Sequence, residues 1–81
     1  MLPDDFDILS EITNIETIAV GLLVRERNIL NHRYGKGHWR KCKGFAIIRY
    51  KDALFTVRAE IHWYEAHGKE RVRWKVKKEL R

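Results

Sequence analysis

The chain has 81 residues, of which 17 are basic, 11 acidic and one a cysteine, and its formal net charge is +6. This length suits one domain, residues 1–81, and excludes a second lobe or a deep cleft. Cys42 cannot form an internal disulfide, no apolar run approaches the roughly 20 residues of a membrane helix, and the first residues are acidic where a signal peptide is basic. We expect a cytoplasmic domain without a membrane partner, and we assign it no cofactor.

The first third of the chain is predicted to be helical up to Gly35. Asp4 or Asp5 is placed to cap a short helix, although residues 1–12 also suit a mobile acidic arm. Apolar residues at helical spacing predict a second helix over residues 22–34, and Gly35 suits its end. The β-branched residues within 15–20 favour a strand there as an alternative.

The second half of the chain has the period-two pattern of β-strands. Residues 44–50, 54–64 and 71–77 are predicted strands, joined as antiparallel neighbours through residues 51–53 and 66–69. The expected fold class is therefore α+β, with N-terminal helical segments packed on one face of a three-stranded antiparallel meander. The alternation places these side chains toward the helices: Phe55, Val57, Ile61, Trp63, Val72, Trp74 and Val76.

The positive charge is concentrated in this second half. Residues 1–35 hold three basic and six acidic residues, a net charge of −3, whereas residues 36–81 hold fourteen and five, a net charge of +9. Such asymmetry is typical of proteins that bind a polyanion. The sequence therefore predicts a small nucleic-acid-binding domain, with RNA favoured over DNA.

The predicted binding residues lie on the solvent face of the sheet and in the loop before it. Basic side chains would contact phosphates, while Tyr64 and Trp39 could stack on bases. The full set is Arg49, Arg58, Tyr64, Arg71, Arg73, Lys75 and Lys77 on the strands, with Lys41, Lys43 and Trp39 from the loop. An interaction module that binds an acidic protein is the alternative from another class, and an open sheet edge leaves homodimerisation open.

Metal-independent RNA cleavage is a sharper interpretation of the same face. A histidine or glutamate takes the proton of a 2′-hydroxyl, and an arginine stabilises the charge on phosphorus. His62, Glu65 and Arg58 are the residues predicted for these roles, and whether the protein is an enzyme stays open. A metal site at His62, Glu65 and His67 is disfavoured, because the two histidines fall on opposite faces of a continuing strand.

Two resemblances add to these predictions. The stretches Trp39-Arg-Lys-Cys-Lys-Gly44 and Ala59-Glu-Ile-His-Trp-Tyr-Glu-Ala-His-Gly68 resemble a family of short bacterial proteins of unknown function, above all cyanobacterial ones, over most of residues 12–78. The layout is also similar to that of RelE/ParE-type toxins, many of which cleave messenger RNA on the ribosome. That resemblance implies a ribonuclease toxin with an antitoxin partner, on the strength of layout alone.

Overall fold

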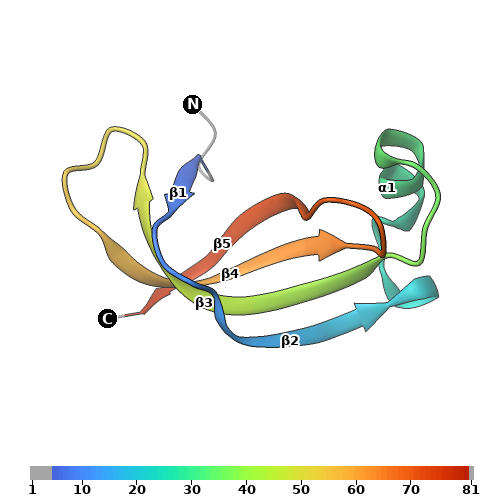
Figure 1. Cartoon of the computed structure of the whole chain (residues 1–81), viewed down its shortest axis with the longest axis horizontal. Coiled ribbons are helices and arrows are strands. Elements are labelled where there is room, and N and C mark those ends of the chain that lie inside the picture. The colour runs from blue at the N-terminus through green and yellow to red at the C-terminus, as the bar shows by residue number, and fades with distance from the viewer. Residues whose placement is uncertain (1–4, 81) are drawn as a thin grey trace.

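The computed structural model describes residues 5–80, which form one antiparallel sheet of five strands with a single short α-helix (Figure 1). The elements follow one another along the chain as β1 (Phe6–Ile8), β2 (Thr13–Val20), a 3₁₀ turn (Gly21–Leu23), α1 (Arg27–Tyr34), β3 (Arg40–Tyr50), β4 (Val57–Glu65) and β5 (Val72–Leu80). In this part of the chain no helix is long and apolar enough to span a membrane.

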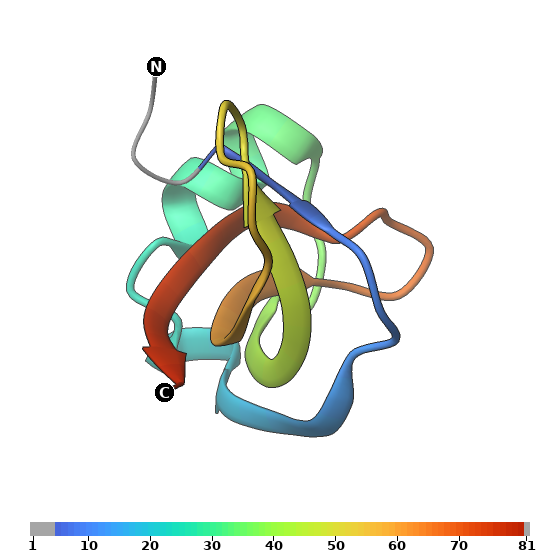
Figure 2. The ribbon, with the colours of Figure 1, turned by 90° about the vertical axis from the view of Figure 1, so that its left-hand side faces the viewer.

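Strand β3 is the centre of the sheet because it is long enough to pair with three others. On one side its first half pairs with β2 and its last residues with β1, while β4 runs along most of its other side, from Arg40 to Ile48. Strand β5 then pairs with β4. The sheet is strongly curled, as the end-on view in Figure 2 shows, so side chains from its two edges, β1 and β5, reach one core.

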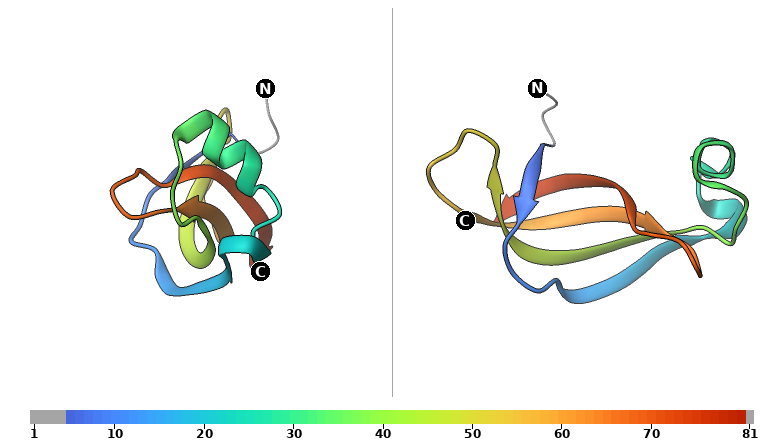
Figure 3. Two further views of the ribbon diagram at one scale, coloured as in Figure 1. Left: turned by 90° about the vertical axis from the view of Figure 1, so that its right-hand side faces the viewer. Right: turned by 45° about the horizontal axis from the view of Figure 1, so that its top comes forward.

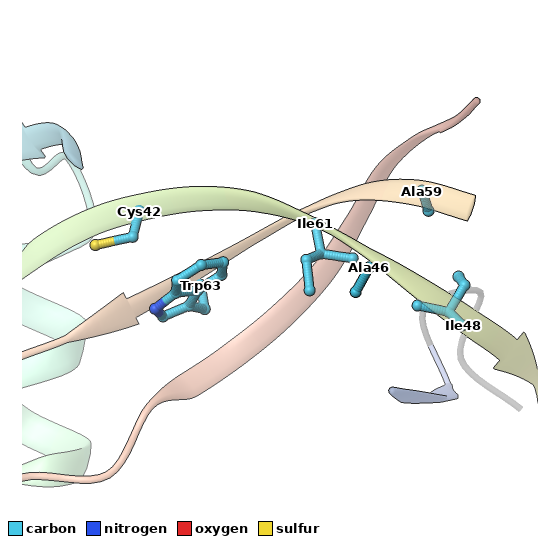
Figure 4. Close-up of a cluster of buried hydrophobic side chains, with 6 residues drawn as sticks. All are labelled: Cys42, Ala46, Ile48, Ala59, Ile61 and Trp63. Carbon is cyan, nitrogen blue, oxygen red and sulfur yellow. The ribbon is translucent and has the colours of Figure 1, made fainter. Parts of the chain in front are cut away.

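This core, called the inner core below, lies on the concave face of the sheet. Its six fully buried members come from β3 and β4, as Figure 4 shows: Cys42, Ala46, Ile48, Ala59, Ile61 and Trp63. The strands carry them at alternate positions, as the period-two rule requires for one face. A Cβ atom on Gly44 would lie 2.5 Å from Cγ2 of Ile12, so only glycine lets the chain before β2 approach this closely.

A second cluster, called the end cluster, lies at the end of the sheet beside α1. It consists of Val24, Leu30, Trp39, Tyr64 and Ala66. The helix lies beyond the ends of the strands and covers neither face of the sheet along its length (Figures 1 and 3). Leu30 is the one buried residue of α1, so the helix closes the end of the sheet and does not form a layer.

The predicted fold class is therefore wrong. The residues expected to form helices on a three-stranded sheet instead supply two strands, β1 and β2, and the helix is confined to residues 27–34. The β-branched side chains of residues 15–20 suit an extended chain, and β3 offers them a free edge to pair with. Because the sheet encloses its core by curling, it needs no helical layer above that core.

Several details of the N-terminal prediction can also be compared with the structure. Phe6, placed on a short helix by its spacing, lies in strand β1, whereas residues 1–4, including the predicted cap Asp4, lie outside the described residues. Gly35 ends α1 with a φ of 98°, a conformation that favours glycine. The alternative strand at residues 15–20 is present within β2.

Candidate nucleic-acid interface

The face of the sheet opposite the inner core, called the outer face, carries a grid of polar and basic side chains from three strands. The register across β3, β4 and β5 groups them into four rows: Lys41, Tyr64 and Val72; Lys43, His62 and Lys75; Phe45, Glu60 and Lys78; and Ile47, Arg58 and Leu80. Neighbouring strands lie about 4.8 Å apart, and successive rows about 6.8 Å apart. The grid therefore brings together five cationic side chains over a length of about 20 Å.

Two irregularities in β5 change the predicted alternation of that strand. Arg73 has a φ of 57°, and there three steps along β5 match two steps along β4. Val72 is therefore paired with Tyr64 on the outer face and not on the face of Trp63, where the alternation predicted it. Lys77 is the extra residue of the second irregularity, between Val76 and Lys78. Extra residues of this kind bend a strand and re-aim its side chains. The unbroken basic alternation of the sequence therefore does not correspond to one uniform face.

Arg71 shows the consequence most clearly, because it lies on the side of the inner core. Its guanidinium lies 5.1 Å from the ring centre of Trp63, and its Nε lies 3.3 Å from Oε1 of Glu65. Arg73 remains beside the outer face, where its Nε donates a 3.0 Å hydrogen bond to Glu26. Both arginines thus already have a carboxylate partner within the chain.

The two aromatic side chains predicted to stack on bases lie in the end cluster. Trp39 is 1% exposed and Tyr64 is 8% exposed, so neither offers a ring face to a base. Burial, together with the nearby carboxylate of Glu26, raises the pKa of Tyr64. The aromatic residue that the outer face does present is Phe45, which is partly exposed and lines a hollow of about 310 Å³ with Ile47 and Arg58.

The other predicted binding residues remain on this surface or at its end. Lys41, Lys43, Arg58 and Lys75 occupy the grid directly, as the register places them. Arg49 lies one step beyond it, at the end of β3 that pairs with Asp7 of β1. Most of the predicted lysines therefore lie on the outer face. The predicted stacking residues, Trp39 and Tyr64, are buried, and Arg71 lies on the side of the inner core.

His62 and Glu60 form the closest polar contact on the outer face. Their side chains are two residues apart on β4, and His62 Nε2 lies 2.7 Å from Glu60 Oε2. Both side chains are largely buried, with 10% and 14% of their surface exposed. The hydrogen bond from His62, aided by the positive charges of Lys43 and Lys78, holds the pKa of Glu60 below its usual value despite burial.

A cavity of about 340 Å³ opens beside this pair at the end of the face nearest α1. Its polar lining consists of these side chains: Glu26, Lys41, His62, Tyr64, Arg73 and Lys75. Lys41 Nζ lies 5.9 Å from the ring centre of Tyr64. The cavity thus combines three cationic side chains with an imidazole, a set of groups that suits a phosphate-bearing ligand.

Glu65, the carboxylate predicted to act with His62, points to the opposite side of β4. It accepts hydrogen bonds from Trp63 Nε1 at 2.8 Å and from Arg40 Nη2 at 2.7 Å, and it has no contact with His62. Burial alone would raise the pKa of Glu65, but these hydrogen bonds and the charges of Arg40 and Arg71 outweigh it and lower the pKa. The structure therefore does not assemble the predicted set of His62, Glu65 and Arg58.

Some residues of the face lacked an assigned role in the sequence. Glu60 shares the strand parity of His62 and is two positions from it, a spacing that by itself predicts neighbouring side chains. Lys78 joins the face because of the second irregularity in β5, which leaves no sequence signal. His67, the other histidine considered for a metal site, is exposed in the turn after β4. Among residues 5–80, no group of three or more His, Cys, Asp or Glu side chains is arranged to hold a metal ion.

Comparison of the chain with protein-family models, with curated proteins and with solved structures found no match.

Proposed function

We propose that the protein binds single-stranded RNA along the outer face of its sheet. The strongest support is the row in which Lys43, His62 and Lys75 lie side by side on three adjacent strands. Lys41, Arg58 and Lys78 extend the positive charge above and below this row. Grooves of this kind hold the phosphate backbone of single-stranded nucleic acids without reading its sequence.

Few acidic groups oppose this charge within the chain. Glu16 of β2 lies 3.5 Å from Lys43, and Glu60 is the carboxylate within the grid. No ion pair of Lys41, Lys75 or Lys78 occurs among residues 5–80, which leaves these ammonium groups available to a ligand. Part of the positive charge of the second half of the chain thus lies on the outer face without an ion-pair partner among residues 5–80.

The shape of the face favours a single strand over a duplex. Its width across three strands is about 10 Å, and its length of about 20 Å suits a few nucleotides. Phe45 supplies one partly exposed ring, and stacking on a base contributes about 1–3 kcal/mol. RNA is preferred because the His62 ring can bond to a 2′-hydroxyl, a group that DNA lacks.

Salt-dependent binding of a fluorescently labelled oligonucleotide tests the proposal. The affinity should fall steeply as salt rises, and Lys43→Gln or Lys75→Gln should each reduce the slope by about 0.7, the value for one phosphate contact on a single strand. Arg33→Gln, which removes the same charge from the exposed surface of α1, is the matched control and should leave the slope nearly unchanged. Equal effects of all three variants would show that binding depends on net charge alone and would overturn the assignment of the outer face.

A further inference from the structure

The Glu60–His62 pair has the form of a positioned base. Glu60 engages Nε2 of His62, and Nδ1 has no hydrogen-bond partner among the described residues. In that part of the chain no fully buried side-chain nitrogen or oxygen lacks a partner, so the unpaired Nδ1 keeps some solvent exposure, although the His62 side chain is only 10% exposed. His62 also lines the 340 Å³ cavity, which gives a ligand access to its ring.

The carboxylate determines which nitrogen of His62 can accept a proton. While Glu60 accepts a hydrogen bond from Nε2–H, the neutral ring must carry its lone pair on Nδ1. The same contact holds the imidazole ring in one orientation, as carboxylates do for catalytic histidines. Glu60 is therefore a positioning residue, and His62 is the group that would touch the substrate.

Cationic side chains surround the place where a phosphate would lie. Lys43 and Lys75 flank His62 from the two neighbouring strands, and Lys75, Lys41 and Arg73 line the cavity with it. Glu26 is the one acidic residue of that lining, and it is paired with Arg73 at 3.0 Å. Negative charge that develops on a phosphoryl group at this position would therefore be stabilised from two sides.

We propose that the outer face cleaves the RNA that it binds, with His62 as the general base, Glu60 as its positioning residue and Lys75 as the cation at the scissile phosphate. This inference rests on the proposed RNA binding. His62 Nδ1 takes the proton of a 2′-hydroxyl, the 2′-oxygen forms a bond to the adjacent phosphorus, and the bond from phosphorus to the 5′-oxygen breaks. The leaving 5′-oxygen takes a proton from the Lys75 ammonium. His62 then releases its proton to solvent and the Lys75 amine takes one up from solvent, so both groups return to their starting states.

The products are a 2′,3′-cyclic phosphate and a 5′-hydroxyl, and no further reactant is needed. The nucleophile belongs to the substrate, so RNA in which every 2′-hydroxyl is methylated binds to the face but cannot be cut. This difference separates the two proposals experimentally. Binding of the 2′-O-methyl strand tests the RNA-binding function, and cleavage of the unmodified strand tests the chemistry.

The experiment compares the wild type with His62→Gln and Glu60→Gln on both strands, with products identified by mass spectrometry. His67→Gln and Glu70→Gln, which change exposed residues in and beside the turn between β4 and β5, are the matched controls purified in the same way. We expect His62→Gln to lower the cleavage rate by about 10²- to 10⁴-fold, the usual contribution of a general base. Glu60→Gln should lower kcat at least about tenfold, while its affinity for the 2′-O-methyl strand is unchanged or higher, because a negative charge is removed.

Four other outcomes would each contradict one part of the proposals. If the 2′-O-methyl strand binds and the unmodified strand stays intact, the cleavage inference is wrong and RNA binding stands. If neither strand binds, the proposed function fails first. If cleavage persists in His62→Gln at the rate of His67→Gln, the activity does not come from this site. A loss of affinity for the 2′-O-methyl strand in Glu60→Gln that matches its loss of kcat would make Glu60 a structural residue only.

Discussion

Glu60 and Glu65 lie on the same strand, and each interacts with the ring nitrogen of a residue two positions away. Glu65 accepts its bond from Trp63 and is also held by Arg40 and Arg71, so both of its oxygens are used. Glu60 has one close partner, His62, at 2.7 Å. Arginine and tryptophan side chains keep their protons near neutral pH, whereas a histidine ring can exchange one. Glu65 is therefore bound to groups of fixed protonation state, and Glu60 to a group that can exchange a proton.

Strand parity is the reason for this difference. Residues five apart on a strand point to opposite faces, so Glu65 lies on the side of the inner core and Glu60 on the outer face. The carboxylate with more partners stabilises the fold, and the one with a single titratable partner is suited to chemistry. The predictions below test this division between the two sides of β4.

The largest expected effect on stability is that of Glu65→Gln. An amide cannot balance the charges of Arg40 and Arg71 or accept as many hydrogen bonds, and hydrogen bonds to charged groups each contribute about 1.5–3 kcal/mol. We expect the free energy of unfolding to fall by about 2–3 kcal/mol in urea denaturation, against less than about 1 kcal/mol for Glu60→Gln. Equal losses in the two variants would remove the distinction between the two carboxylates.

Gly44→Ala should cost slightly less. The added Cβ would lie 2.5 Å from Ile12 Cγ2 and 3.1 Å from the backbone oxygen of Thr13, so the segment before β2 must shift. Overpacking of this kind typically costs about 1–3 kcal/mol. Lys75→Ala on the outer face is the control and should change the free energy of unfolding by no more than about 0.5 kcal/mol. If Gly44→Ala left the free energy of unfolding unchanged, the inner core would have space for a Cβ atom that the structure does not show.

Acid should weaken the fold through Glu65. Its pKa is lowered in the folded state, so the ionised carboxylate contributes stability above the unfolded value of about 4.3. That contribution is lost as the pH falls through the lower, folded pKa. Urea denaturation of the wild type between pH 6 and pH 3 should therefore show a steeper decline than Glu65→Gln, and parallel curves would contradict this account.

The smallest effect is expected at Cys42, which lies in the inner core beside Thr17 and is 1% exposed. Burial raises the pKa of this thiol, so little reactive thiolate forms in the native protein. Iodoacetamide at pH 8 should label the native chain very slowly and the urea-unfolded chain fully, as mass spectrometry can follow. Rapid labelling of the native protein would show that reagents reach the inner core and would contradict the burial of Cys42.

The three strands of the second half were the predictable part of this fold, whereas β1 and most of β2 lie where helices were expected. Alternation identified the segments around Ile61 and Val76 as neighbouring antiparallel strands, because period-two burial is a local property of the backbone. The N-terminal segment was predicted wrongly, since the helical spacing of Phe6, Leu9 and Ile12 is a local signal that tertiary pairing overrides. This segment forms strand β1 because it pairs with the free edge of β3, which is more than 30 residues away in the chain.

The residues of the candidate site were likewise predictable only in part. Arg58 of β4 was placed on the outer face by parity, which regular strands preserve. Lys41 and Lys43 were assigned to a loop, and that assignment was wrong because β3 begins at Arg40. Arg71, Lys78 and the contact of Glu60 with His62 were not predicted correctly, because the two extra residues of β5 and the rotamer of a partly buried side chain depend on packing. Glu65 was selected from the sequence as the catalytic carboxylate. Its hydrogen bond with Arg40 could not be predicted locally, because the two residues are 25 positions apart in the chain.

The sequence alone determined that the second half of the chain is extended and strongly basic, since charge and alternation are properties of the residues themselves. The tertiary structure decided which charges share a surface, because this depends on strand register, on irregularities within the strands and on the curl that encloses the core. It also decided that Glu60 forms a hydrogen bond with His62, because strand parity places both side chains on one face but the rotamers that bring them together depend on packing.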